Sequence, residues 1–417
     1  MKAFVKGGLT SLAVALVAGI IAGCGGSSGP TKINWYVFPE PSGSFAKAAA
    51  DCSKASNGKY QIVINFLSNA SDQQRQTLVQ RLAAGDSSID ILAMDVDWTA
   101  EFASAGWIRP WTGANAAAAS KGVLAGPLKT ATYNGKLWAA PINSNTELLW
   151  YRKDLVPNPP KTWTQMINDS IKLAKEGKPH FIEEQGAKYE GLVVWFNSLV
   201  DSAGGGIVGP NGKVTVGPST KTAAEIMKRL ATTAAADPGL NTSQEGPGNS
   251  AFDSGSAAFQ INYPFVWSGT QTTAPSVFKH MGYAPFPAVV PGTSPKVSIG
   301  GYNLGVSSHS QHPQLAFDAV KCLIGPQNQI RDAVKGGLAP VLSSIYDEPS
   351  FEKAYPFHAL IKAQLQDYGI RPQTPQYQDV TLAIQDSLQP ASAIDPSDIV
   401  DKLRDEIKTA LKGDSLL

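Results

Sequence analysis

The first part of the chain alternates short apolar runs with longer amphipathic stretches. Short apolar runs bounded by turn residues predict buried strands, and apolar residues at helical spacing predict helices. Successive segments predict strand, helix, strand, helix and strand over 32–38, 43–55, 60–67, 72–84 and 89–94. This order predicts a doubly wound α/β sheet that is covered by helices on both faces.

Helices become more frequent in the rest of the chain. Further helices are expected near 162–176, 189–203, 219–236 and 313–323, and strands over 257–262 and 298–306. Near the C-terminus Ile399, Leu403 and Ile407 repeat every four residues, with Asp395 as the expected N-cap and Pro396 at the first helical position. Two α/β lobes account for this pattern most simply.

The N-terminus carries the pattern of a targeting segment. Two lysines precede an apolar run over 9–22, which is shorter than the ~20 residues that a membrane span needs. A cleaved signal peptide over 1–23 is therefore expected. The run ends in Ile21-Ala22-Gly23-Cys24, which resembles the lipobox of bacterial lipoproteins, in which the cysteine is acylated. Residues 24–30 then form a flexible tether, and the protein is expected on the extracytoplasmic face of the cell membrane, lipid-anchored through Cys24. An ordinary signal peptide with a chance cysteine is the alternative.

Composition excludes several classes of protein. Lys and Arg number 35 against 34 Asp and Glu, so the chain lacks the basic excess that nucleic-acid binding needs. Hydrophobic residues make up 43%, which is enough for buried cores, and three cysteines are too few for a disulfide scaffold or a Cys-rich zinc module. Cys52 and Cys322 fall in predicted helices, and the residues alone leave open whether they pair.

Catalytic motifs are matched only poorly. The G-x-S-x-G match at 25–29 lies in the tether and not on a strand-to-helix turn. The G-x-G-x-x-G match at 204–209 follows a predicted helix and runs into hairpin residues, which disfavours dinucleotide binding. The sequence has no Walker phosphate loop and no H-E-x-x-H motif, and its histidines are scattered. No catalytic residue, metal site or cofactor is therefore predicted, although a pair of glycosidase carboxylates stays open.

Polar and aromatic residues gather where the predicted strands end. Ligands of open α/β sheets bind beyond these ends, and a sugar needs carboxylates and amides for its hydroxyls and an aromatic ring for its C–H face. Glu40 and Asp95 could instead cap the helices that follow them. The ligand-binding candidates are Glu40, Asp95, Asn143, Asn145, Tyr263, Trp267, Gly300, Gly301 and Arg371.

An ordered set of short motifs carries a family resemblance. Besides the lipobox, the set comprises Asp90–Asp95, Trp98–Trp107, Tyr133–Pro141, Leu149–Leu155, Phe252–Phe259 and Gly300–Val306. Together they resemble the carbohydrate-binding lipoproteins of ABC importers. The resemblance implies a two-lobed, periplasmic-binding-protein-like α/β fold with a ligand cleft between the lobes. It also implies a monomeric, non-enzymatic receptor without cofactor that delivers sugar to ABC permease subunits.

Within that family the chain is similar to trehalose-binding lipoproteins of mycobacterial importers. The supporting residues are Glu40, the segment from Asp95 to Phe102, and Arg371-Pro372-Gln373-Thr374-Pro375-Gln376-Tyr377. The resemblance implies a disaccharide ligand, trehalose first. It places Glu40, Asp95, Asn145, Gly301 and Arg371 on ligand positions, with Asn143 as a neighbour. Tyr263 stands where relatives often have tryptophan, with Trp267 four residues on, which keeps a ring for stacking.

The same resemblance implies how the chain divides. Lobe 1 would comprise 30–140 and 300–345, and lobe 2 would comprise 141–299 and 346–417, with crossings near 140–145 and 298–306. Both cysteine-bearing helices then belong to lobe 1, which implies a disulfide between Cys52 and Cys322. An exported glycoside-processing enzyme and a binding protein for another solute, such as a peptide or polyamine, are the alternatives.

Overall fold

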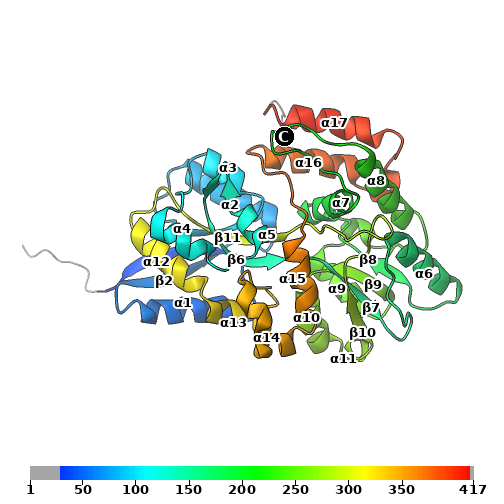
Figure 1. Cartoon of the computed structure of the whole chain (residues 1–417), viewed down its shortest axis with the longest axis horizontal. Helices are drawn as coiled ribbons and strands as arrows, with labels where there is room; N and C mark the ends of the chain where they lie inside the picture. The colour runs from blue at the N-terminus through cyan, green and yellow to red at the C-terminus, as the bar shows by residue number, and fades with distance from the viewer. Residues whose placement is uncertain (1–28, 414–417) are drawn as a thin grey trace, which may run out of the picture.

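Two helix-covered β-sheets lie side by side in the computed structural model, which describes residues 29–413 (Figure 1). The predicted signal peptide, Cys24 and the tether up to residue 28 lie outside the described residues. Within 29–413, none of the helices combines the length and the apolar character that crossing a bilayer requires. We call the part built on the first sheet lobe 1 and the part built on the second sheet lobe 2.

The sheet of lobe 1 is mixed, with the strand order β2-β1-β3-β11-β6. Its parallel part pairs β1 with β2 and β3, and β11 runs antiparallel to both β3 and β6. The strands are β1 (Thr31–Val37), β2 (Tyr60–Phe66), β3 (Ile91–Asp95), β6 (Ala140–Asn145) and β11 (Gly300–Val306).

Both faces of this sheet are apolar. Successive side chains of a strand point to opposite faces, so neighbouring residues of one strand pack into different clusters. Trp35 packs on one face against α1 (Ser44–Ala55) and α12 (Pro313–Leu323), whereas its neighbour Tyr36 packs on the other face with α2 (Ser71–Ala83). The predicted covering of the sheet on both faces is thus confirmed. The other elements of this part are α3 (Thr99–Ser104), α4 (Gly113–Ser120), α5 (Ala125–Thr130), β4 (Thr132–Tyr133) and β5 (Lys136–Leu137).

The sheet of lobe 2 has the order β10-β7-β9-β8. Its strands are β7 (Leu148–Arg152), β8 (Phe181–Glu183), β9 (Ala257–Asn262) and β10 (Met281–Ala284). Its main core packs these strands against α6 (Trp163–Lys175), α7 (Glu190–Ser202), α8 (Pro218–Ala231), α16 (Tyr377–Leu388) and α17 (Ile399–Ala410).

A third hydrophobic cluster includes residues of α10 and of α15, the helix that lies between the two sheets in Figure 1. It joins Trp150 of β7 to Phe357 and to Ile361 of α15. The elements around this cluster are α9 (Glu245–Asp253), α10 (Phe265–Thr273), α11 (Pro275–Phe278), α13 (Pro326–Gly336), α14 (Pro349–Ala354) and α15 (His358–Gln366).

Two details differ from the expected pattern. The C-terminal helix begins at Ile399 after Asp398, because Asp395 instead accepts hydrogen bonds from the backbone and hydroxyl of Ser397, and Pro396 lies in that turn. In addition, β6 belongs to the first sheet, so the chain passes from the first sheet to the second after Asn145 rather than at 140. The rest of the division into lobes stays a prediction.

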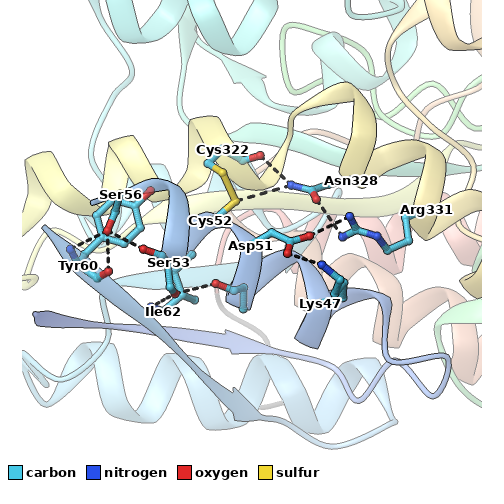
Figure 2. Close-up of a disulfide and its surroundings, with 11 residues drawn as sticks. Lys47, Asp51, Cys52, Ser53, Ser56, Tyr60, Ile62, Cys322, Asn328 and Arg331 are labelled. Carbon is cyan, nitrogen blue, oxygen red and sulfur yellow. Dashed lines mark hydrogen bonds and ion pairs between the residues drawn. A yellow bond between two sulfur atoms is a disulfide. The ribbon is translucent and has the colours of Figure 1, made fainter. Parts of the chain in front are cut away.

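A disulfide joins Cys52 of α1 to Cys322 of α12 (Figure 2), the pairing that the family resemblance implied. The two residues are 270 positions apart in the sequence. The side-chain amide of Asn328 donates to the Cys322 carbonyl at 2.9 Å, and Arg331 pairs with Asp51 at 3.0 Å. The bond therefore fixes the first helix of lobe 1 to a segment that the chain reaches only after passing through lobe 2.

Removing this bond should lower the stability of the protein. We expect the double variant Cys52→Ala, Cys322→Ala to lose about 2–5 kcal/mol of unfolding free energy, because the unfolded chain regains the freedom of a long loop. Urea unfolding of the oxidised protein and the variant measures the loss. Arg331→Ala, which removes only an ion pair beside the bond, serves as a control and should change the midpoint little. Equal midpoints for wild type and the double variant would contradict the expectation.

Candidate functional site

A cavity of about 400 Å³ lies between the two sheets and takes its walls from both lobes. This volume falls in the range of roughly 300–1,000 Å³ that small-molecule sites occupy. Lobe 1 contributes Asn69, Ala70, Ser71, Asp72, Gln73, Asp95, Asn145, Gly300, Gly301 and Tyr302. The opposite wall comprises Lys188, Tyr189, Glu190, Gly191, Val194, Gln244, Glu245, Tyr263 and Arg371.

The wall in lobe 1 is built from strand ends that meet at one sheet edge. Asp95 ends β3 and Asn145 ends β6, and between them β11 begins with Gly300 and Gly301. Because β11 runs antiparallel to both neighbours, its start lies beside their ends: Tyr302 pairs with Asp95, and Gly300 pairs with Asn145. The structure therefore brings together four of the candidates that the strand ends predicted.

Gly301 occupies a position that only glycine fits. Its φ is +114°, and an added Cβ would lie 2.5 Å from the carbonyl oxygen of Asn143 and 2.7 Å from the Cα of Ser144. Any side chain would therefore collide with the backbone of β6. The glycine lets β11 and β6 approach closely at the cavity floor.

The opposite wall comes mainly from the starts of helices. Tyr189 and Glu190 begin α7, Glu245 begins α9, and Tyr263 follows the end of β9. The first N–H groups of a helix have no partner within the helix, so they can donate to a bound molecule. Sequence reasoning centred on strand ends found Tyr263 but missed Tyr189, Glu190 and Glu245. The helix-start pattern Tyr189-Glu190-Gly191 was the available signal.

Arg371 lies at the centre of a buried ion network that bridges the lobes. Its guanidinium donates to Asp95 Oδ1 at 3.0 Å and to Glu190 Oε1 at 2.7 Å, and it lies 3.4 Å from Asp97 Oδ1. Glu190 also accepts from Thr381 Oγ1 at 2.6 Å and from the hydroxyl of Tyr377. Arg371 is only 3% exposed, so its charge is balanced by protein groups and not by water.

The carboxyl groups of this network differ in the direction of their pKa shifts. Burial acts to raise the pKa of Asp95, but the Arg371 guanidinium together with hydrogen bonds from Asp97 and Ser71 outweighs it, and the pKa is lowered overall. Burial raises the pKa of Asp97 well above its usual range, against the attraction of Arg371, and also raises the pKa of Glu190. Asp95 is therefore the ionised acceptor of the site at neutral pH.

The cavity lining is acidic. Burial raises the pKa of Asp72 and of Glu245, both of which line the cavity. Of the two basic residues in the lining, Arg371 is matched by the carboxylates around it, and Lys188 pairs with Asp386. The site thus suits hydroxyl groups, which can donate to carboxylates, and disfavours an anionic ligand.

Three of the predicted ligand residues lie outside the cavity lining, namely Glu40, Trp267 and Asn143. Glu40 accepts from the backbone N–H of Ser42 at 2.7 Å and of Ser44 at 3.0 Å, so its carboxylate binds the start of α1. Trp267 packs instead among aromatic rings, with ring centroids 4.7 Å from Phe278 and 5.6 Å from Phe357. Neither side chain lines this cavity: the carboxylate of Glu40 accepts from the start of α1, as the alternative capping role predicts, and a turn of α10 separates Trp267 from Tyr263. A direct sugar contact by either residue stays a prediction.

Asn143 is a neighbour of the cavity and not part of its lining. Its side chain is buried, and its amide donates to Asn145 Oδ1 at 3.3 Å. It can therefore orient the Asn145 amide. Asp95, Asn145, Tyr263, Gly300, Gly301 and Arg371 are the predicted residues that the structure places around one cavity.

Comparison with known proteins places this chain in a family. The sequence pattern of the bacterial extracellular solute-binding proteins matches residues 39–330. The chain belongs to this family. It is similar to a probable ABC transporter-binding protein of Deinococcus radiodurans, with 30% identity over 316 residues that cover 73% of this chain and 74% of the relative. The members of this family are binding proteins.

Solved structures show the same two-lobed fold. Maltose-bound MalE3 of T. maritima superposes with a TM-score of 0.83 at 26% identity, over 91% of this chain and all of that protein. The GacH receptor of Streptomyces glaucescens, solved unliganded and with acarbose, superposes with a TM-score of 0.79 at 20% identity, over 92% of this chain and 99% of the receptor. The predicted two-lobed periplasmic-binding-protein fold is confirmed.

Proposed function

We propose that this protein is the receptor of an ABC sugar importer, which binds a disaccharide between its lobes and delivers it to the permease subunits. The observation that carries the proposal is the cavity itself. It is lined from both lobes by carboxylates and amides together with the rings of Tyr263 and Tyr302. The maltose held by the similar T. maritima protein supports a sugar as the ligand.

The chemistry of the lining favours a neutral sugar. Asp95 is ionised and can accept from hydroxyl groups, Asn145 can both accept and donate, and Tyr263 offers a ring face for sugar C–H groups. The acidic lining disfavours sugar phosphates and uronic acids. The disaccharide that we propose first is trehalose, on the resemblance to trehalose-binding lipoproteins, and the receptor acts as a monomer.

Binding from two walls couples the sugar to closure of the lobes. A ligand that contacts both walls stabilises the closed arrangement by its differential affinity for it. Hydroxyl groups that leave water must find protein partners in the closed site, so specificity depends on Asp95, Asn145 and Arg371. The closed, liganded form then presents both lobes to the membrane permease in the arrangement that it recognises.

A thermal-shift screen tests the proposal. The mature protein is heated with trehalose, maltose, glucose, glucose 6-phosphate, a tripeptide and spermidine, each at several concentrations. We expect the disaccharides to raise the melting temperature in proportion to the logarithm of their concentration, and the phosphate and the tripeptide to leave it unchanged. A shift with the tripeptide or spermidine alone would assign the protein to another solute class.

The membrane anchor is part of the proposal and has its own test. We expect Cys24→Ala to move the protein from the membrane fraction to the soluble extracytoplasmic fraction, because the acylated thiol supplies the membrane attachment. Cell fractionation with immunoblotting follows the protein, and Cys52→Ala is the matched control that should leave the membrane fraction unchanged. Persistence of the Cys24→Ala protein in membranes would contradict a lipid anchor.

A further inference from the structure

A chain of buried polar side chains begins at the cavity wall and leads into lobe 2. The hydroxyl of Tyr189, which lines the cavity, donates to Gln185 Oε1 at 3.1 Å. The amide of Gln185 then donates to Glu147 Oε1 at 3.0 Å. Gly191 makes room for the first bond, since a Cβ there would lie 2.1 Å from the Tyr189 hydroxyl. The position of this tyrosine thus depends on Glu147.

Glu147 lies in the first segment that joins the two sheets. It falls between β6 of the first sheet and β7 of the second, and its backbone carbonyl accepts from the Gln364 amide at 2.8 Å. Its side chain is wholly buried. A carboxyl group placed here is therefore connected to both the cavity wall and the backbone that joins the two sheets.

The polar chain continues to the second connecting segment. Ser198 of α7 donates to Glu147 Oε2 at 3.4 Å and accepts from the backbone N–H of Ser298 at 3.0 Å. Ser298 precedes β11 and is bridged to Gly369. The contacts of Glu147 therefore reach the residues just before Gly300, on the cavity floor.

Asn197 extends the chain to the third connecting segment, which runs from α15 to α16. Its amide donates to Ser298 Oγ at 2.8 Å and to Asp201 Oδ2 at 2.9 Å. Asp201 in turn accepts from the backbone N–H of Ile370 at 3.1 Å, next to Arg371. One network of hydrogen bonds thus touches three segments between the sheets: the one that follows Asn145, the one that precedes Gly300 and the one that carries Arg371.

We propose that Glu147 is a positioning residue, which ties the cavity wall at Tyr189 to the segments that connect the lobes, so that sugar affinity depends on whether its buried carboxyl group is ionised. This rests on the proposed sugar-binding function. Burial raises the pKa of Glu147 to about 8, so the group is neutral at pH 6.5 and ionised above pH 8. Ionisation would place a charge among buried acids. The bonds that Gln185 and Ser198 donate offset part of this cost, and the remainder favours opening of the site, where water can reach the group, and so weakens binding.

Other ionisable groups face Glu147 from each surrounding element. Glu184 follows β8, Glu245 begins α9, Tyr263 follows β9, and Arg371 lies on the third connecting segment. Burial raises the pKa of Glu184 well above its usual range, and the nearby carboxyl group of Glu147 raises it further. Burial also raises the pKa of Asp201 to about 7, which gives the network a second proton with a lower midpoint.

The first test is the pH profile of trehalose affinity, measured by calorimetry between pH 6 and pH 9.5. We expect the wild-type Kd to rise at least about fivefold through a midpoint near pH 8, the low end of typical coupling between two sites. Glu147→Gln, which mimics the neutral acid, should keep the pH 6.5 affinity and lose the component near pH 8. Glu183→Gln is the matched control: burial also raises the pKa of Glu183 to about 8, but it faces Asp237. Its affinity profile should follow wild type.

The second test needs no sugar, so it separates this inference from the proposed function. Amide exchange in the unliganded protein gives protection factors for the Ser298 and Ile370 N–H groups, corrected for intrinsic exchange at each pH. We expect both to fall between pH 7.5 and 9.5 in wild type and to hold steady in Glu147→Gln. Ser198→Ala should lower the Ser298 factor at every pH, which tests the path even if Glu147→Gln does not fold. Flat wild-type protection, or a Glu147→Gln profile that matches wild type, would overturn the proposal.

Discussion

Replacing Arg371 by methionine should lower the free energy of unfolding by about 3–5 kcal/mol at pH 7.5, the cost of leaving buried charges without a partner. The substitution leaves Asp95 and Glu190 in place without the guanidinium that bonds them at 3.0 and 2.7 Å. Urea unfolding at constant pH measures the loss. Arg371→Lys should recover only part of it, because an ammonium group cannot present the same planar fork to two carboxylates.

The pH dependence of this variant has a defined sign. Without Arg371 the buried carboxyl groups bind protons more readily in the folded protein than in the unfolded chain, so lowering the pH towards 5 should shrink the stability loss. Arg331→Met removes a partly exposed ion pair with Asp51 and should shift the midpoint little at either pH. An Arg371→Met protein that unfolds at the same urea concentration as wild type would show that the ion network does not stabilise the folded protein.

Removing the ionised acceptor of the cavity should weaken sugar binding strongly. We expect Asp95→Ala to raise the Kd for trehalose roughly 10- to 150-fold, because a hydrogen bond to a charged group contributes about 1.5–3 kcal/mol. Calorimetry at pH 7 measures the change. Glu40→Gln is the matched control, since the structure places this carboxylate at the start of α1 and outside the cavity.

The Glu40→Gln control tests where the ligand binds, because the structure places Glu40 outside the cavity lining whereas the family resemblance places it on a ligand position. If Glu40→Gln weakened binding as much as Asp95→Ala, the carboxylate would be a ligand group and the placement of the cavity would be wrong. Tyr263→Ala should also weaken binding through loss of a stacking surface, whereas Tyr263→Trp should largely retain it. Unaltered affinity in Asp95→Ala would remove the site assignment.

The strand ends were predictable because a strand can be recognised locally, as a short apolar run that is bounded by turn residues. Apolar runs locate β3 and β11 in the sequence, and a sheet edge then brings Asp95 and Gly300 together with Asn145 of β6. The order of these strands in the sheet was harder to predict, since β11 follows the strands of lobe 2 in the chain and yet pairs antiparallel with β3 of lobe 1. Such pairing depends on contacts between segments that are distant in sequence.

The predicted residues that lie outside the cavity lining have two plausible roles. Glu40 follows a strand as a ligand would, but it also precedes a helix, and the backbone N–H groups of Ser42 and Ser44 use its carboxylate. Trp267 shares a segment with Tyr263, yet a turn of α10 directs it to the aromatic cluster. The helix starts that build the opposite wall were missed because helix capping and ligand binding draw on the same polar residues.

The most direct test of the central claim is a calorimetric titration of the mature wild-type protein with trehalose, followed by overnight incubation of the same sample and chromatography of the sugars. We expect saturable binding at one site per chain and full recovery of trehalose. Released glucose would make the protein an enzyme, and the absence of binding to trehalose and to every other sugar of the panel would contradict a sugar receptor.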